Sequence, residues 1–412
     1  MLSNTIIIIL VIVFAIVFFT LYFNKYEVKP DNIIKLLNSN DIKVININNE
    51  NELKNKRDWD IVINDKTYFN DIINSGTIGI GESYMDGKWD CDSLDVLYDK
   101  IIFNKLDKNF QFENIADKIK IIISYLFNQQ SKGDKSYEVE DVHYNIGNDL
   151  YENMLGNTMA YSCGYWTLTN NLDQAQINKF ELICKKLQLK QDDNVLDIGS
   201  GFGGLAKYMA DNYGCKVTGV NISTEQLKYA RKLCEKHILD GKIKFIDCDY
   251  RDVPEDEKYD KIVSVGFCEH VGYKNYRIFC QKAYNCLKDG GLFLLHTIGG
   301  NVSTTCTDPW IDKYIFPNGL LPSVSQLSSA VEDLFVIEDL HNFGPYYDKT
   351  LMAWYKNYED AIKNGKIKNN KKFYRMWRYY LLTCAACFRA RSTQLWQIIL
   401  SKGNRNLYEC VR

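Results

Sequence analysis

The stretch that most constrains the fold is residues 194–204, NVLDIGSGFGG, where a short apolar run ends in closely spaced glycines. The run 195–198 has the composition of a buried strand, and the residues after Gly204 have that of a helix. Glycines between a strand and a helix permit positive φ in a sharp turn and let a bound molecule approach the backbone. The helix start offers free N–H groups to an anion. The stretch alone predicts either a structural turn or a cofactor site.

Strand and helix signals alternate regularly from His143 onward. Strands are expected at 195–198, 215–220, 243–246, 261–265 and 292–296, with helices such as 224–237 and 276–287 between them. This order predicts an α/β fold with a parallel sheet and helices on both faces. Ligands of such sheets bind at the carboxyl ends of the strands, beside the point where the strand order reverses.

The segments that follow the five predicted strands are 199–201, 221–223, 247–252, 266–272 and 296–300, and four of the five carry polar or ionisable groups. A nicotinamide dinucleotide site favours G-x-G-x-x-G and an acid closing the second strand, whereas this chain has G-x-G-x-G and Asn221. The spacing fits S-adenosylmethionine, with Asp197 and the glycines near its amino-acid part. Ser223 and Gln226 also fit a helix capping box, so Gln226 is a candidate for a cap or for a ligand contact.

Four of the five histidines, His143, His270, His296 and His341, lie in polar, aromatic-rich segments, and only His237 sits at an ordinary helix end. One alternative is that each is a hydrogen-bonded core histidine. Their common setting favours a shared polar pocket.

Composition excludes some classes of function. The formal charge of -2, from 50 basic and 52 acidic residues, provides no global attraction to nucleic acid. The 13 cysteines are odd in number and irregularly spaced, which favours a reducing compartment over a disulfide scaffold. Cys384 and Cys387 form a lone C-x-x-C in an apolar helical stretch, so we expect no metal site.

Residues 6–23 carry no charge and are long enough to cross a hydrocarbon core of about 30 Å as a helix. A signal peptide is the alternative, but no basic residue precedes the run and no small-residue cleavage site follows it. Lys25 and Lys29 follow the run, so we expect a single-pass membrane anchor with the catalytic body on the cytoplasmic side.

Three parts are therefore expected: an anchor at 1–23, a small N-terminal α/β domain with a linker at 24–138, and a catalytic domain at 139–412. The polar stretch between Asn128 and Val139 marks the boundary. Within the small domain, residues 79–89 place aromatic and acidic residues between glycines, which also fits a turn beside a packed helix.

Long motifs throughout the body make the chain resemble the cyclopropane-fatty-acyl-phospholipid synthases, relatives of the mycolic acid cyclopropane synthases. They are residues 81–87 (GESYMDG), 143–151 (HYNIGNDLY), 159–166 (MAYSCGYW), the glycine turn, 269–272 (EHVG), 294–299 (LLHTIG), 308–319 (DPWIDKYIFPNG), 341–344 (HNFG), 347–348 (YD), 350–354 (TLMAW), 388–391 (FRAR) and 394–397 (QLWQ). The resemblance covers the small N-terminal domain but not the apolar residues 6–23. It implies a Rossmann-like S-adenosylmethionine methyltransferase fold.

The reaction implied by the resemblance transfers a methyl from S-adenosylmethionine to a cis double bond of a phospholipid acyl chain, with proton loss and ring closure. An alkene is a weak nucleophile, so the site must align it and stay dry. Aromatic side chains could stabilise the cation or merely pack; the candidates are Tyr161, Tyr165, Trp166, Tyr314, Phe316 and Trp354.

The resemblance also implies site residues. A bicarbonate ion is expected as the base, held by Cys163, Glu269, His296, Ile298 and Tyr347, with Cys163 and Ile298 contributing backbone groups and Glu269 having a raised pKa. Cofactor positions carried over by motif are Tyr161, Ser162, Gly199, Ser200, Gly201, Asn221, Gln226, Tyr250, Arg251 and Val265.

Two cysteines need comment, because one departs from the family motif and the other matches a family cysteine. Cys268 stands where the family has an aromatic residue, which puts the acyl-chain preference in doubt. Cys384 matches a family cysteine sometimes assigned a nucleophilic role, but methyl transfer to an alkene needs no thiolate and its neighbours are apolar, so we interpret it as structural.

Two other functions remain as alternatives, a related lipid C-methyltransferase that forms a methyl branch and a silent lipid-binding homologue. A homodimer is expected from the resemblance only.

Overall fold

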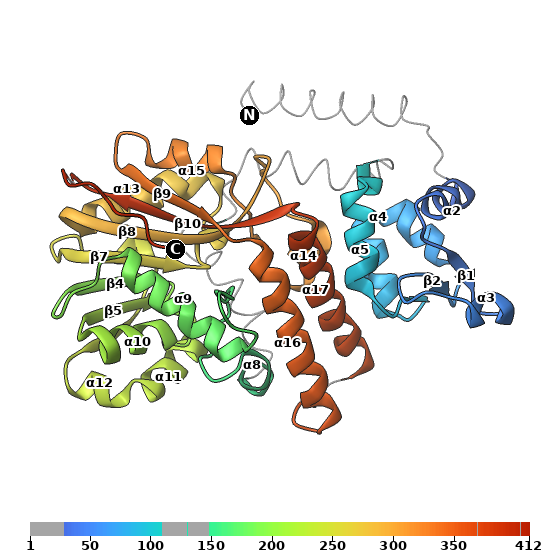
Figure 1. Cartoon of the computed structure of the whole chain (residues 1–412), viewed down its shortest axis with the longest axis horizontal. Helices are drawn as coiled ribbons and strands as arrows, with labels where there is room; N and C mark the ends of the chain where they lie inside the picture. Colours follow the sequence, from blue (N-terminus) through green and yellow to red (C-terminus); the bar gives the residue numbers. More distant parts are fainter. Residues whose placement is uncertain (1–28, 109–129, 131–147, 369, 404) are drawn as a thin grey trace, which may run out of the picture.

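The computed structural model describes residues 29–108, 130, 148–368, 370–403 and 405–412. Its larger part is built on a seven-stranded sheet with the order β6-β5-β4-β7-β8-β10-β9 (Figure 1). The strands are β4 (Asn194–Ile198), β5 (Lys216–Asn221), β6 (Ile243–Asp247), β7 (Tyr259–Val265), β8 (Leu287–Gly300), β9 (Val336–Asn342) and β10 (Thr393–Ser401).

The sheet is mixed. Strands β4 to β8 pair in parallel, whereas β10 runs antiparallel between β8 and β9. The predicted parallel sheet is thus correct for five strands but lacks two antiparallel ones. The predicted end of the fifth strand at residue 296 is wrong, because β10 pairs with β8 from Leu292 to Gly300 and extends it. The strand order reverses between β4 and β7, as the predicted position of the site requires.

Helices cover both faces of the sheet. On one face α9 (Leu172–Lys186), α10 (Gly204–Tyr213) and α11 (Thr224–Leu233) enclose a core that includes Val195, and on the other α13 (Tyr276–Cys286) and α15 (Val324–Val331) enclose one that includes Leu196. Alternate residues of a strand point to opposite faces, so a run buried on both sides is apolar throughout. The helix predicted at 224–237 is divided at Cys234, after which α12 (Glu235–Leu239) begins.

The N-terminal elements form a small three-stranded sheet with β1 (Val44–Asn46), β2 (Ile61–Ile63) and β3 (Trp89–Asp90), and helices α2 (Pro30–Ser39), α3 (Glu50–Lys54), α4 (Tyr68–Met85) and α5 (Leu94–Phe103). They share one hydrophobic core with α16 (Pro345–Lys363) and α17 (Lys371–Arg389); α17 lies beside α5, and α16 lies on the other side of α17 (Figure 1). Arg389 of α17 forms an ion pair with Asp95 of α5 at 2.9 Å.

Two predictions fall on residues that the structure does not describe, namely the anchor at 6–23 and the boundary near 138. In the described ranges, no helix has the length and apolar character of a membrane span. Residues 79–89 form the end of α4, a turn and β3.

Candidate active site

The glycine turn joins β4 to α10. Gly199, Gly201 and Gly203 have φ values of +83°, +52° and +82°, in the region that favours glycine. A Cβ on Gly199 would lie 2.8 Å from the Phe267 side chain, whereas a Cβ on Gly201 would meet no atom within 4 Å. Gly199 is therefore needed for packing, and Gly201 leaves the backbone open to the neighbouring cavity.

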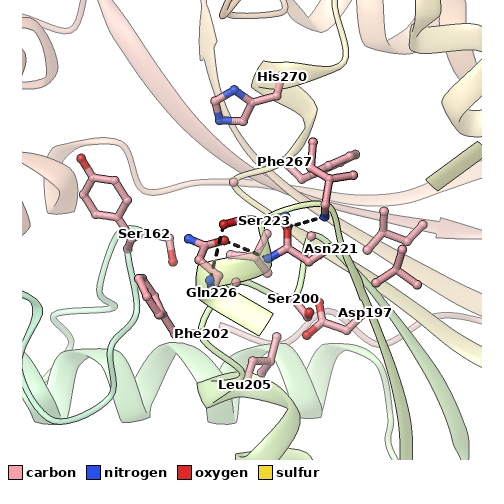
Figure 2. A pocket seen from close by; sticks show the side chains of 18 of the residues that line it. Ser162, Asp197, Ser200, Phe202, Leu205, Asn221, Ser223, Gln226, Phe267 and His270 are labelled. Atoms are coloured by element: carbon pink, nitrogen blue, oxygen red, sulfur yellow. Dashed lines mark hydrogen bonds between the residues drawn. The ribbon is translucent and has the colours of Figure 1, made fainter. Parts of the chain in front are cut away.

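That cavity lies at the carboxyl ends of β4, β5 and β7 (Figure 2). All ten positions predicted to contact the cofactor line it: Tyr161, Ser162, Gly199, Ser200, Gly201, Asn221, Gln226, Tyr250, Arg251 and Val265. They come from the loop before α9 and from the ends of successive strands. The fold thus brings this set together in one place.

Four buried polar atoms of residues at the cavity have no hydrogen-bond partner among the described residues: Asp197 Oδ2, Ser200 Oγ, the Tyr250 hydroxyl and His270 Nδ1. Burial also raises the pKa of Asp197 to about 7. An unsatisfied buried polar group costs about 1–3 kcal/mol unless a ligand or water bonds to it. S-adenosylmethionine carries an ammonium, ribose hydroxyls and an adenine ring, so its donors and acceptors fit these atoms.

Three of the predicted polar contacts, Asn221, Gln226 and Arg251, are already bonded within the protein. Asn221 Nδ2 donates to Gln226 Oε1 at 2.8 Å, and Ser223 Oγ accepts from the Gln226 backbone N–H at 3.4 Å (Figure 2). Ser223 therefore caps α11, but the capping box is incomplete because the Gln226 side chain turns to Asn221. Arg251 forms an ion pair with Asp249 at 2.6 Å.

The sequence analysis missed Lys179, whereas His270, which it assigned to a polar pocket, does line the cavity. Lys179 is 1% exposed, and burial lowers its pKa to about 7. His270 has an unpartnered Nδ1 among the described residues, and burial lowers its pKa to about 4. No motif pointed to Lys179, because a lysine in an amphipathic helix pattern is normally read as exposed.

A second group of buried polar residues adjoins the cavity, and we call it the buried cluster. It includes Glu269 on η4 (Cys268–His270) and His296 on β8, which are connected through β8 because Glu269 bonds to the backbone of Ile298, two residues after His296. Glu269 Oε1 accepts from the Ile298 backbone N–H at 2.7 Å, while Glu269 Oε2 and His296 Nε2 have no partner in the described part of the chain. The predicted backbone group of Ile298 is thus already engaged by Glu269.

The protonation states of this cluster suit an anion. Burial raises the pKa of Glu269 to about 7 and lowers that of His296 well below its usual value. Gln397 Nε2 lies 3.2 Å from His296 Nδ1, which leaves Nε2 as the protonated nitrogen of a neutral ring. A protonated Glu269 and His296 Nε2 are both hydrogen-bond donors.

Cys163 and Tyr347 complete the predicted set. Burial, with further contributions from Cys163 and Glu269, raises the pKa of Tyr347 well above its ordinary value, so the Tyr347 hydroxyl stays protonated. Burial also raises the pKa of Cys163 to about 12, so its thiol stays protonated. None of the five predicted bicarbonate residues lines the cofactor cavity, but their chain neighbours Ser162 and His270 do.

Of the aromatic residues predicted to stabilise a cation or to pack, some lie near cavity residues and others pack in the core. Tyr161 lies 5.2 Å from Trp354, ring to ring, and Phe316 lies 5.7 Å from His270. Tyr314 instead packs on Trp310, and Trp166 Nε1 donates to Thr350 Oγ1.

The shared histidine pocket is not observed for His341. Unlike His270, it does not line the cavity and contacts Lys186 Nζ at 3.1 Å, because β9 carries it to the sheet edge. His143 lies outside the described residues.

The two cysteines pack in the interior. Cys268 is buried in the core between the sheet and α13, so its side chain does not enter the cavity. Burial raises the pKa of Cys384 well above its usual value, as expected for a structural thiol rather than a nucleophile.

Comparisons with known proteins identify relatives of this chain. The family described as mycolic acid cyclopropane synthetase matches residues 131–398. Cyclopropane-fatty-acyl-phospholipid synthase of Escherichia coli K12 is 47% identical over 347 residues, covering 84% of this chain and 89% of that protein. Sphingolipid C9-methyltransferase of Komagataella phaffii is 33% identical over 350 residues, covering 80% and 70%.

Solved structures agree as well. Mycolic acid cyclopropane synthase CmaA1, solved in complex with SAH and CTAB, has a TM-score of 0.61 and 27% identity, covering 66% of this chain and all of that one. The fold, the cavity and these identities lead to one conclusion. The chain belongs to the cyclopropane synthase family, which includes the mycolic acid cyclopropane synthetases and the cyclopropane-fatty-acyl-phospholipid synthases.

Proposed function

We propose that this protein is a cyclopropane-fatty-acyl-phospholipid synthase, which converts a cis double bond of a phospholipid acyl chain into a cyclopropane ring. The observation that carries the proposal is the juxtaposition of a cavity with unpartnered polar atoms and a buried Glu269–His296 cluster, joined through adjacent residues of η4. The first fits the methyl donor, and the second fits a small anion that accepts a proton.

S-adenosylmethionine supplies an electrophilic methyl group. The residues of this chain hold it: the glycine turn provides close access to the backbone, and Asp197, Ser200 and Tyr250 provide polar partners. Holding the donor against the alkene replaces an encounter in solution by a fixed geometry, which can lower a barrier by about 7–11 kcal/mol.

The protein must also keep water from the cation that forms on the acyl chain. Tyr161, Trp354 and Phe316 belong to one aromatic-rich core or pack against it, and Trp354 is fully buried. Such faces both exclude solvent and attract positive charge.

We infer that the buried cluster holds a bicarbonate ion. Glu269 Oε2 and His296 Nε2, unpartnered among the described residues, would bind it, and the ion would supply the base for proton removal. A buried Glu269 carboxyl that is protonated near neutral pH would donate to the anion instead of repelling it.

A methyl-branching C-methyltransferase is the second candidate, since the chain is 33% identical to a sphingolipid C9-methyltransferase. Both products require loss of a proton from the cation, from the transferred methyl for a ring and from a chain carbon for a branch. A base held by Cys163, Glu269, His296, Ile298 and Tyr347 would serve ring formation if it faces the transferred methyl, and the isotope content of the product distinguishes the two.

The membrane supplies the substrate. We propose that residues 6–23 anchor the protein with its body on the cytoplasmic side, on the basis of the uncharged apolar run and the lysines that follow it. Protease treatment of sealed vesicles tests this: the body should be digested in inverted vesicles, which expose the cytoplasmic side, and protected in right-side-out ones. We also propose a homodimer, which light scattering of the detergent-solubilised protein would test.

The enzymatic proposal is tested with purified full-length protein, vesicles of unsaturated phospholipid and methyl-labelled S-adenosylmethionine, with and without added bicarbonate. Label should enter the acyl chains and depend on bicarbonate. His296→Gln should remove this activity, and His237→Gln, on the protein surface beside Asp211, should retain it. Absence of label from the wild-type lipid would contradict the proposal.

A further inference from the structure

Lys179 is a buried lysine in the wall of the cofactor cavity, and no carboxylate of the described residues pairs with it. Its Nζ donates to Ser162 Oγ at 2.6 Å and to Gln176 Oε1 at 2.7 Å, and among the described residues it forms no ion pair. Lys186, the other buried lysine of α9, does have an acid partner, because its Nζ lies 3.4 Å from Asp339 Oδ2. Buried charges are normally paired, so Lys179 lacks an anion.

The hydrogen bonds around Lys179 also orient the Ser162 hydroxyl. A lysine ammonium only donates, so Ser162 Oγ is the acceptor and its own hydrogen must point to another group. No described residue accepts that hydrogen. Gln176 fixes the arrangement, because its Nε2 donates to the Ser162 backbone carbonyl at 2.8 Å while its Oε1 holds Lys179. Ser162 and Lys179 both line the cavity.

An anion at this point in the cavity would satisfy both groups. The charge of Lys179 acts on Cys163 and His296, neither of which is an anion here, since Cys163 is a neutral thiol and His296 a neutral ring. The cavity itself accommodates S-adenosylmethionine, whose amino-acid part ends in a carboxylate.

We propose that Ser162 and Lys179 form the receptor for the carboxylate of S-adenosylmethionine, with the Ser162 hydroxyl as donor and Lys179 as the positioning residue that supplies the charge. This rests on the assignment of the cavity to S-adenosylmethionine, but not on the ring-forming reaction. It therefore predicts a binding preference that can be measured without any lipid.

The test compares two ligands of the full-length protein by calorimetry in detergent. S-adenosylhomocysteine has the carboxylate, and 5′-methylthioadenosine keeps the adenosine and sulfur but lacks it. Lys179→Met should weaken binding of the first by about 10- to 100-fold, the range for a charge-assisted hydrogen bond, and of the second by less than about threefold. Ser162→Ala should show the same preference, and the double variant should lose less than the sum of the two effects.

Lys186→Met is the matched control, because it removes a buried lysine from the same helix outside the cavity, and it should bind both ligands like wild type. Equal loss of both ligands in Lys179→Met would overturn the proposal, since Lys179 would then only shape the cavity. Unchanged affinities for both ligands with an altered bicarbonate requirement would also overturn it, because the charge of Lys179 would then stabilise bicarbonate and not the carboxylate of S-adenosylmethionine. If Lys179→Met does not fold, Ser162→Ala alone tests the proposal: it should weaken binding of S-adenosylhomocysteine more than binding of 5′-methylthioadenosine, and equal weakening would overturn the proposal.

Discussion

Replacing Glu269 by glutamine should stabilise the protein at neutral and alkaline pH while removing its activity. The Glu269 carboxyl is buried, and its pKa rises from 4.5 to about 7 because burial disfavours the carboxylate. The folded state therefore binds this proton more tightly than the unfolded chain does. Below pH 4.5 the group has no effect; as the pH rises to about 7 it destabilises the fold, and above that its cost is constant.

The size of the effect follows from the two pKa values. A difference between 4.5 and about 7 corresponds to about 3 kcal/mol at pH 8 and under about 1 kcal/mol at pH 5. Glutamine keeps the oxygen that accepts from the Ile298 N–H, so it avoids the charge without losing that bond. Asp197, with its own raised pKa, is present in both proteins and its effect cancels.

Urea unfolding of wild type and Glu269→Gln in bicarbonate-free buffers from pH 5 to pH 8 measures this difference. The free energy of unfolding of Glu269→Gln, relative to that of wild type, should increase by about 2 kcal/mol from pH 5 to pH 8. Glu235→Gln, on the exposed surface of α12, controls for removal of a carboxylate as such. A difference that does not change with pH, or a variant less stable than wild type at pH 8, would refute the reasoning.

Three further predictions concern single residues. Gly201→Val should reduce S-adenosylhomocysteine affinity at least about tenfold by calorimetry, because the side chain would enter the cavity, and unchanged affinity would contradict this placement. Cys384→Ala should retain label transfer within about twofold of wild type, whereas loss of a nucleophile would cost on the order of a hundredfold or more. Gly81→Ala should lower the free energy of unfolding by about 1–3 kcal/mol in urea titrations, since its Cβ would lie 2.3 Å from the Trp310 ring, and wild-type stability would mean that α4 does not pack tightly on Trp310.

The residues that line the cofactor cavity could be predicted from sequence, because each lining segment consists of residues that are close together in the chain. A buried strand is apolar along its length, a sharp turn requires glycine, and the residues after parallel strands converge at one edge of the sheet. Asn221 and Tyr250 were found by this rule, and the resemblance placed Tyr161 and Ser162 on the same cavity.

The buried cluster could not be predicted that way. Its members come from the loop before α9, η4, β8 and α16, and only the resemblance grouped them. Strand β10 was missed because its partner β8 precedes it by about a hundred residues and the connection is not the helix of a parallel pair. Lys179 was missed because a helix pattern does not reveal that one of its charged residues is buried.

The measurement that tests the central claim most directly is the isotope content of the product made from S-adenosylmethionine with a fully deuterated methyl group. Ring closure removes one hydrogen isotope from the transferred carbon, so mass spectrometry should find two deuterium atoms in the modified acyl chain, with loss of the double bond by NMR. Three retained deuterium atoms beside an intact double bond would identify a methyl branch and contradict the account.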